Sequence, residues 1–330
     1  MLRLTLSGLV SEGLFHFFLA FNLITGEVIG LVGIVCNVLN ILVFTRQGFK
    51  DTVNITLTAL AVSDLGALIT IQINNIMLNP WFLYADVPFD PVDVLVMVSM
   101  YPHNYFIRVS GFITAFASFE RCVCVVVPLK LKLLITKRVT VTVITVIYIA
   151  TLPVVFPVYY TTYLDWTYSP ATNKSYLAAN FRPTRNEVFA VSYFITDLFV
   201  PNFTFVVIIT CTSIIGVKLR RTAQWKQTMN KSGVTGKEMK VVLMLTTVSL
   251  TFIVCLIPES ALLCASSLIR NLSLRGKYFD VSMCCYCVVL FMENVCNTVN
   301  TLVYLKMSGR YRKTLMELLL AWGIRTKKLG

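Results

Sequence analysis

Long apolar runs, separated by short polar and charged segments, dominate the pattern of this chain. A helix needs about 20 apolar residues to cross roughly 30 Å of hydrocarbon at about 1.5 Å per residue. Seven runs reach that length, so the pattern predicts an all-α membrane protein, a bundle of seven transmembrane helices. Their predicted ranges are about 26–45, 55–77, 97–127, 139–160, 187–217, 238–268 and 278–305.

The two ends of the chain are predicted to lie outside this bundle, which occupies residues 24–305. Residues 1–23 are mildly apolar, and because no clear small-residue cleavage site follows them, we expect a short outer tail rather than a signal peptide. Residues 306–330 have helical spacing of apolar and basic positions, which predicts an amphipathic helix on the cytoplasmic membrane surface. Its apolar face consists of Tyr311, Leu315, Leu318, Leu319 and Trp322.

Composition excludes a soluble protein. With 56% hydrophobic and 14% charged residues, a soluble domain of 330 residues would expose far too much apolar surface. The net charge of +13 does not indicate nucleic-acid binding, because the bases cluster at the ends of apolar runs. The segments after the first, third and fifth runs and the C-terminal tail hold 20 of the 29 Lys and Arg residues. This asymmetry predicts a multi-pass membrane protein with its N-terminus on the outer side. The expected location is the plasma membrane, with an extracellular N-terminus.

Two glycosylation sequons lie in segments that are predicted to be extracellular. They begin at Asn173 in the 161–186 loop and at Asn271 between the sixth and seventh spans, so a glycoprotein is expected. All ten cysteines lie inside the predicted spans or at their ends, so no extracellular disulfide pair is evident.

An adjacent acid and base, Glu120 and Arg121, lie near the end of the third apolar run. A charged side chain costs roughly 2.5–3.5 kcal/mol at the centre of a membrane helix. The pair is therefore expected at the cytoplasmic boundary, either in a functional role or as an ordinary interfacial anchor.

Several motifs occur in the order and at the spacing of one large family. They are Asn37 in GIVCNVLN, Asp64 in LTALAVSDL, Glu120-Arg121-Cys122 followed by Pro128-Leu129, Pro201, Phe252 six residues before Pro258, Asn300 four residues before Tyr304, and Tyr311. Over about residues 24–323 the chain resembles a rhodopsin-class (class A) G-protein-coupled receptor. The phrases NPWF, VPFDP and FERCVCVVVPLK also resemble the expanded chemosensory-receptor sets of molluscs.

The resemblance implies a receptor that binds an extracellular chemical or peptide ligand and activates a heterotrimeric G protein through movement of the sixth span. It implies that Arg121 pairs with Glu238, at the start of that span, and holds the inner face closed. The alternative for Glu238 is a solvated acid in the first turn of a helix. The coupling and switch residues that the resemblance implies are Glu120, Arg121, Leu129, Glu238, Phe252, Pro258, Asn300 and Tyr304.

Some positions depart from the family pattern. Val96 stands where the family has the Cys of its outer disulfide, and the partner Cys is also missing. Packing or aromatic residues are therefore expected to hold the 161–186 loop. Leu256, Thr301 and Ile209 replace a Trp, a Pro and a Tyr, which affects the expected activation switch and leaves the fold prediction unchanged.

Four polar residues are expected to gather deep in the bundle. Oxygen ligands suit a hard cation, so a sodium ion is one expectation for this site, and a water-linked polar network is the other. No other cofactor is expected. The four residues are Asp64, Ser110, Asn297 and Asn300.

The ligand site is predicted from charges that lie too deep to reach water. Arg108 lies thirteen residues before Arg121, about 20 Å along the helix axis, and needs a partner such as Asp197 in the fifth span. This pair has either a ligand-binding or a purely structural role. Three further residues, His103, Glu259 and Glu293, are expected to face the same cavity. Three acids against one Arg and one His favour a cationic or polar ligand, and a carboxylate bound by Arg108 is the alternative.

Two other function classes are also consistent with the sequence. A seven-helix transporter would explain the buried charges, although no internal repeat or matched pair of broken helices is apparent. A non-signalling decoy or partner receptor is compatible with the altered switch residues. An enzyme is least expected, because the sequence shows no combination of nucleophile, base and metal ligands.

Overall fold

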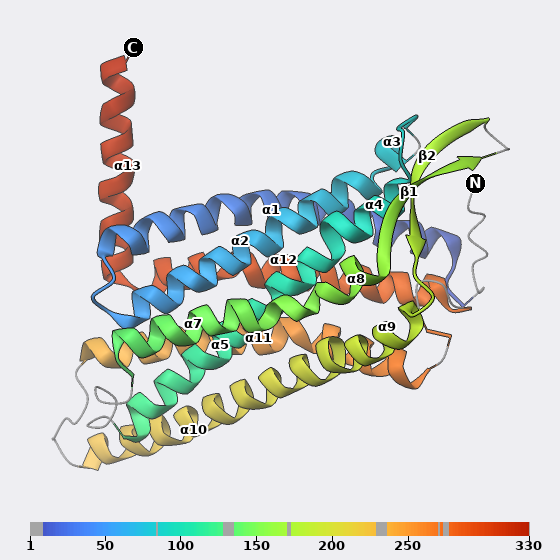
Figure 1. Cartoon of the computed structure of the whole chain (residues 1–330). Helices are drawn as coiled ribbons and strands as arrows, with labels where there is room; N and C mark the ends of the chain where they lie inside the picture. Colours follow the sequence, from blue (N-terminus) through green and yellow to red (C-terminus); the bar gives the residue numbers. More distant parts are fainter. Residues whose placement is uncertain are drawn as a thin grey trace.

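The structure is a computed structural model that describes residues 9–83, 85–127, 135–169, 173–228, 236–269, 271–272 and 277–329. Within these residues, seven helical segments are long and apolar enough to cross a membrane, which confirms the predicted fold class. They lie side by side in one bundle (Figure 1). The segments are Glu12–Gln47, Thr52–Leu78, Pro91–Val126, Lys137–Thr161, Arg185–Lys218, Lys240–Leu268 and Phe279–Met307.

Several of these segments are built from more than one helical element. The elements are α1 (Glu12–Gln47), α2 (Thr52–Leu78), α3 (Pro80–Leu83), α4 (Pro91–Leu95), η1 (Val96–Met100), α5 (Tyr101–Val126), α7 (Lys137–Thr151), η2 (Leu152–Val154), α8 (Phe156–Thr161), α9 (Arg185–Tyr193), η3 (Phe194–Phe199), α10 (Val200–Thr228), α11 (Gly236–Leu268), α12 (Phe279–Met307) and α13 (Gly309–Leu329).

The first helix begins earlier than predicted, at Glu12 rather than near Gly26. The Ser11 side chain caps it by accepting a hydrogen bond from the Leu14 backbone N–H, and the apolar run that follows contains no helix breaker. Most of the predicted N-terminal tail is therefore helical. At about 1.5 Å per residue, α1 is longer than a membrane is thick.

Two π-helical turns interrupt the third and fifth spans. In each case a proline follows closely, Pro102 after η1 and Pro201 after η3. Proline has no backbone N–H to offer the preceding turn, which favours a local change in the hydrogen-bond pattern. The change alters the direction of the side chains in the turn, and η3 contains Asp197, one of the residues predicted for the ligand site.

The 161–186 segment, predicted as a loop, forms an antiparallel hairpin of β1 (Thr162–Ser169) and β2 (Lys174–Phe181). It lies at one end of the bundle, called here the hairpin end, and α13 lies at the other, the α13 end (Figure 1). At the centre of β2, the Leu177 N–H donates to the Pro88 carbonyl oxygen at 2.9 Å, and its carbonyl accepts from the Asp90 N–H at 2.8 Å. These bonds anchor the hairpin to the segment before α4.

Side chains add to this attachment. The Asp93 carboxylate accepts a hydrogen bond from the Ala179 N–H at 2.9 Å, and the Arg185 guanidinium lies 3.7 Å from the centre of the Phe181 ring. Aromatic contacts were expected to replace the missing disulfide. The hydrogen bonds to residues 88–93 were not predicted.

At the opposite end, α13 projects away from the bundle, close to perpendicular to its long axis (Figure 1). Tyr311 is fully buried and its hydroxyl donates to Asn40 Oδ1 at 2.6 Å, while Leu318 is also buried. Leu319, predicted on the same apolar face, is about half exposed in the isolated chain. The side chain of Trp322 lies outside the described residues. The amphipathic helix is present, and only part of its apolar face packs against protein.

Glycine allows α1 to approach its neighbours closely. A Cβ atom at Gly33 would lie 2.2 Å from Thr298 Oγ1 on α12 and 2.8 Å from Leu68 Cδ1 on α2. Both distances are shorter than non-bonded contacts allow. Gly33 therefore fixes the contact of α1 with α2 and α12.

We expect Gly33→Ala to destabilise the protein by about 1–3 kcal/mol, because the added methyl group overpacks this contact. The measurement is the apparent Tm of purified protein in detergent. Gly13→Ala, on the same helix with no atom within 4 Å of the added methyl, is the matched control and should not lower the Tm. Equal Tm values for the two variants would show that the helices separate easily at Gly33.

Candidate functional site

The buried charges nearest the hairpin end centre on Arg108 of α5, whose side chain is 4% exposed. Its Nη2 atom lies 2.8 Å from Glu259 Oε1 on α11 and 3.6 Å from Asp197 Oδ1 in η3. The predicted partner Asp197 is present, but Glu259 is the closer one. One guanidinium therefore links three transmembrane spans, in a setting where an unpaired charge would be costly.

The local backbone places both acids. Asp197 lies in the π-helical turn before Pro201, and it accepts a hydrogen bond from Thr196 Oγ1 at 2.7 Å. Glu259 directly follows Pro258, which lies inside α11. Glu259 Oε2 is buried and has no hydrogen-bond partner among the described residues. The cluster therefore contains a carboxylate oxygen that can accept a further donor.

A second pair lies beside this cluster. His103 Nε2 is 2.9 Å from Glu293 Oε2, and its Nδ1 is 3.0 Å from the carbonyl oxygen of Ala67. Because a carbonyl oxygen only accepts, Nδ1 carries a proton, and Nε2 shares a second proton with Glu293. The pair has no net charge whichever of the two holds that proton.

The five predicted ligand residues therefore gather in one part of the bundle. Glu259 lies near enough to His103, and Glu293 near enough to Arg108, for their charges to interact. With the His103–Glu293 pair neutral, one Arg faces two carboxylates. The group therefore carries one excess negative charge when both acids are ionised.

Deeper in the bundle, three of the four residues predicted for a sodium site meet. Asp64 accepts from Ser110 Oγ at 2.6 Å and from Asn300 Nδ2 at 2.9 Å. Asn297 is buried one turn before Asn300, and its backbone carbonyl accepts from Asn37 Nδ2 at 2.8 Å. Among the described residues no cationic side chain pairs with Asp64. The negative charge of an ionised Asp64 therefore suits a bound cation. The sodium ion stays a prediction.

The residues that replace the family pattern have identifiable contacts. Leu256 packs in an apolar cluster with Phe252, Ile208 and Cys296. Thr301, in place of proline, accepts a hydrogen bond from Asn40 Nδ2 at 2.8 Å. The helix thus gains a side-chain hydrogen bond to α1 at the position where the family has proline, which has no hydroxyl to accept it.

Near the α13 end, Tyr304 is buried between two aromatic rings. Its ring centre lies 5.3 Å from that of Phe44 and 5.7 Å from that of Tyr311. Because Tyr311 also bonds to Asn40, this aromatic group joins α1, α12 and α13.

The acid and base at the end of α5 are both buried. Arg121 Nη2 lies 2.8 Å from Glu120 Oε1, which also accepts from Thr52 Oγ1 on α2 at 2.6 Å. Their side chains are 8% and 2% exposed, which is far less than expected for an ordinary interfacial anchor. The side chain of Glu238 and all of Leu129 lie outside the described residues, so the Arg121–Glu238 pair stays a prediction.

One interhelical contact was not predicted. The hydroxyl oxygens of Ser118 on α5 and Ser249 on α11 are 2.7 Å apart and buried, less than one turn from Arg121. Both are small polar residues within apolar runs, which marks each as a candidate for helix packing. Nothing in a single sequence indicates that these two pair with one another.

The two predicted glycosylation sites are exposed. Asn173 lies in the hairpin turn with a φ of 52°, and its Oδ1 accepts from the Tyr168 hydroxyl at 2.6 Å. Asn271 lies between α11 and α12. Glycosylation itself stays a prediction.

Comparison with known proteins agrees with this geometry. The family described as "7 transmembrane receptor (rhodopsin family)" matches residues 36–304, a range that runs from α1 to Tyr304 of α12. No match was found among the curated proteins compared. The family match covers most of the chain and includes at least part of each of the seven spans. The chain belongs to the rhodopsin family of seven-transmembrane receptors.

Proposed function

We propose that this receptor binds an extracellular ligand, a small molecule or a peptide, at the hairpin end and activates a heterotrimeric G protein at the α13 end. The observation that carries the proposal is the contact of Arg108 with Glu259 and Asp197, at 2.8 and 3.6 Å. A ligand that competes for Glu259 changes the forces between α5 and α11, and one that competes for Asp197 changes the forces between α5 and the fifth span. Such a differential contact is what a ligand needs to shift a conformational equilibrium.

A cationic or polar ligand fits this group best. Arg108 already faces two carboxylates, whereas Glu259 Oε2 is a buried acceptor without a partner among the described residues. A carboxylate ligand would have to compete with both acids for the guanidinium. The excess negative charge supports the cation and disfavours the carboxylate alternative.

A ligand-induced change in the position of α11 can reach the α13 end through a few contacts. The Ser118–Ser249 contact joins α5 to α11, and the Glu120–Arg121 pair follows within one turn on α5. In our proposal, outward movement of α11 breaks the serine contact and releases Arg121 to the G protein. Glu238, placed on the first turn of α11 by its backbone, then loses its contact with Arg121.

The membrane setting follows from the same proposal. The excess of basic residues on one side predicts that the α13 end is cytoplasmic and that the protein lies in the plasma membrane. The hairpin, with Asn173, is then extracellular. We also propose a sodium ion at Asp64 and a chemosensory role, the latter from the sequence phrases described above.

The ligand proposal can be tested by screening primary amines and amidated basic peptides against matched carboxylates for G-protein recruitment. A cationic activator is expected. Glu259→Gln should weaken its potency by about tenfold to a hundredfold, since one charge-assisted hydrogen bond contributes roughly 1.5–3 kcal/mol. Glu187→Gln, an exposed acid on α9, is the control. A carboxylate activator that loses potency with Arg108→Gln would favour the alternative instead.

The coupling proposal predicts ligand-free G-protein recruitment in cells at matched surface expression. Arg121→Ala should abolish it, and Glu120→Gln should raise it because the carboxylate that holds Arg121 loses its charge. Glu238→Ala is expected to raise it as well. Glu317→Gln, an exposed acid on α13, should change nothing. A flat baseline with every variant and every class of G protein would contradict the proposed coupling.

Ser249→Ala should also raise ligand-free recruitment, by up to about fivefold, because the serine contact between α5 and α11 contributes roughly 1 kcal/mol. Thr247→Ala is a matched control, since the Thr247 hydroxyl donates only within its own helix, to the Leu243 carbonyl at 2.9 Å. If both variants behave alike, the effect comes from the helix itself and the serine contact has no role in the inactive state.

A further inference from the structure

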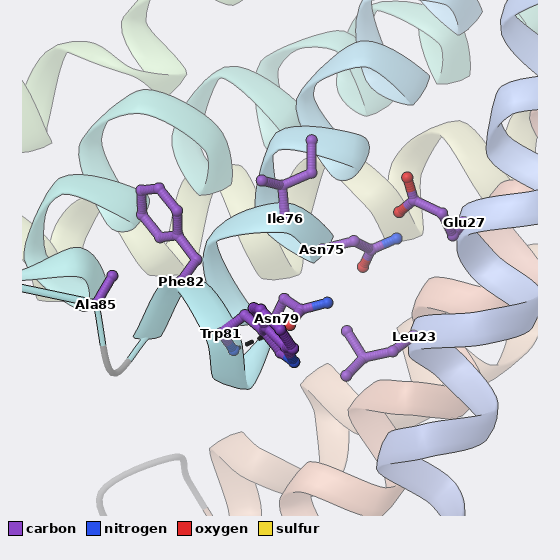
Figure 2. Close-up of a pocket in the computed structure, with 8 residues that line it drawn as sticks. All are labelled: Leu23, Glu27, Asn75, Ile76, Asn79, Trp81, Phe82 and Ala85. Carbon is purple, nitrogen blue, oxygen red and sulfur yellow. Dashed lines mark hydrogen bonds between the residues drawn. The ribbon is translucent and has the colours of Figure 1, made fainter.

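A cavity of about 640 Å³ lies between α1 and α2 at the hairpin end, and none of the ligand-site residues described above lines it. Figure 2 shows Leu23 and Glu27 on one helix face, with Asn75, Ile76 and Asn79 opposite them. Trp81, Phe82 and Ala85 complete the lining. Each of the two helices thus contributes both polar and apolar side chains to a single groove.

The groove opens on the outside of the bundle rather than toward its centre. Trp81 is 91% exposed and Ile76 is 53% exposed, although both line the cavity. A tryptophan beside a helix end is typical of the interface between hydrocarbon and headgroups. An occupant can therefore enter from the surrounding bilayer or from its surface.

Glu27 is the one charged residue in this lining. Figure 2 shows its carboxylate and the Asn75 carboxamide pointing toward each other from opposite walls. Asn75 is 3% exposed, and neither its Oδ1 nor its Nδ2 has a hydrogen-bond partner among the described residues. The groove therefore offers a carboxylate and a buried, unpartnered amide oxygen, both of which accept hydrogen bonds.

Further unpartnered acceptors lie behind these two. A Cβ atom at Gly26 would be within 3.4–3.6 Å of atoms of Asn22, Asn75 and Asn294, so three carboxamides converge there. Asn22 Oδ1 and Asn294 Oδ1 are also buried without a hydrogen-bond partner among the described residues. The unpartnered atoms of these three carboxamides are three oxygens and one nitrogen, Asn75 Nδ2, so acceptors exceed donors. Buried polar atoms are normally satisfied, which indicates that a further donor belongs beside them.

From this arrangement we infer that the groove between α1 and α2 binds the ammonium group of an amphiphile. The ammonium lies between Glu27 and Asn75 Oδ1, and the hydrocarbon chain lies along Leu23, Ile76 and Phe82. An ammonium supplies both positive charge and several N–H donors, whereas an anionic headgroup supplies neither. The same chemistry is available from an aminophospholipid of the bilayer or from a soluble long-chain amine.

The test uses the full chain in nanodiscs of phosphatidylcholine, with dodecylammonium as the probe. Trp166, Trp225 and Trp322 are changed to Phe, so that the remaining indole fluorescence reports on Trp81 in the groove. We expect a saturable fluorescence change with dodecylammonium and none with dodecyl sulfate. Glu27→Gln should raise the Kd by about tenfold or more, because the charge-assisted contact is lost.

Two variants control for folding and location. Glu12→Gln changes an acid on the same helix, about 20 Å from Glu27 along the axis, and should leave the Kd unchanged. Ile76→Phe fills the groove without touching the acid or adding a second indole, and it should also weaken binding. A non-saturable titration, or the same Kd for native protein and Glu27→Gln, would mean simple partitioning into the bilayer and would overturn the inference.

A second arm separates the two sources of the ligand. Part of the phosphatidylcholine is replaced by phosphatidylethanolamine, whose headgroup carries a primary ammonium. A higher apparent Kd for dodecylammonium would identify the lipid as a competitor and natural occupant. An unchanged Kd, with the Glu27 dependence retained, would assign the groove to a soluble amine.

Discussion

The structure depends above all on how a guanidinium is held inside a membrane bundle. Arg108 is almost fully buried, and only carboxylates from two other spans make that position acceptable. This requirement restricts the rotation of α11 and the geometry of the π-helical turn in the fifth span, because each must present an acid to the same cation. The ion pairs of Arg108 therefore also determine how the helices near the hairpin end are arranged.

The same principle recurs with weaker partners toward the α13 end. Asp64 is held by a serine and an asparagine, Glu120 by its neighbour Arg121 and by Thr52, and Ser118 by Ser249. Apart from the Glu120–Arg121 pair, which lies within α5, these contacts cross between spans, so polar groups help to distinguish one helix arrangement from another. Lipid is as apolar as the helix surfaces, which leaves packing alone with little preference among arrangements.

The sequence predicted the seven spans and most of the residues that meet, because hydropathy and deeply placed charges restrict both strongly. It was less successful where a choice between partners was needed. Asp197 was favoured over Glu259 for Arg108 because helix spacing gives height but not rotation, and η3 changes that rotation locally. The hairpin's position was missed because the hydrogen bonds that attach it are made to a segment more than 80 residues away. The early start of α1 was missed because mildly apolar residues fit a tail as well as a helix.

The attachment of the hairpin has a consequence for the behaviour of the protein in different redox environments. Its hold on residues 88–93 consists of backbone hydrogen bonds and a carboxylate contact, with a valine, Val96, at the position where the family has the first cysteine of its disulfide. Such bonds break and re-form by thermal motion alone. The attachment of the hairpin therefore does not depend on thiol chemistry, and a reducing agent does not release it.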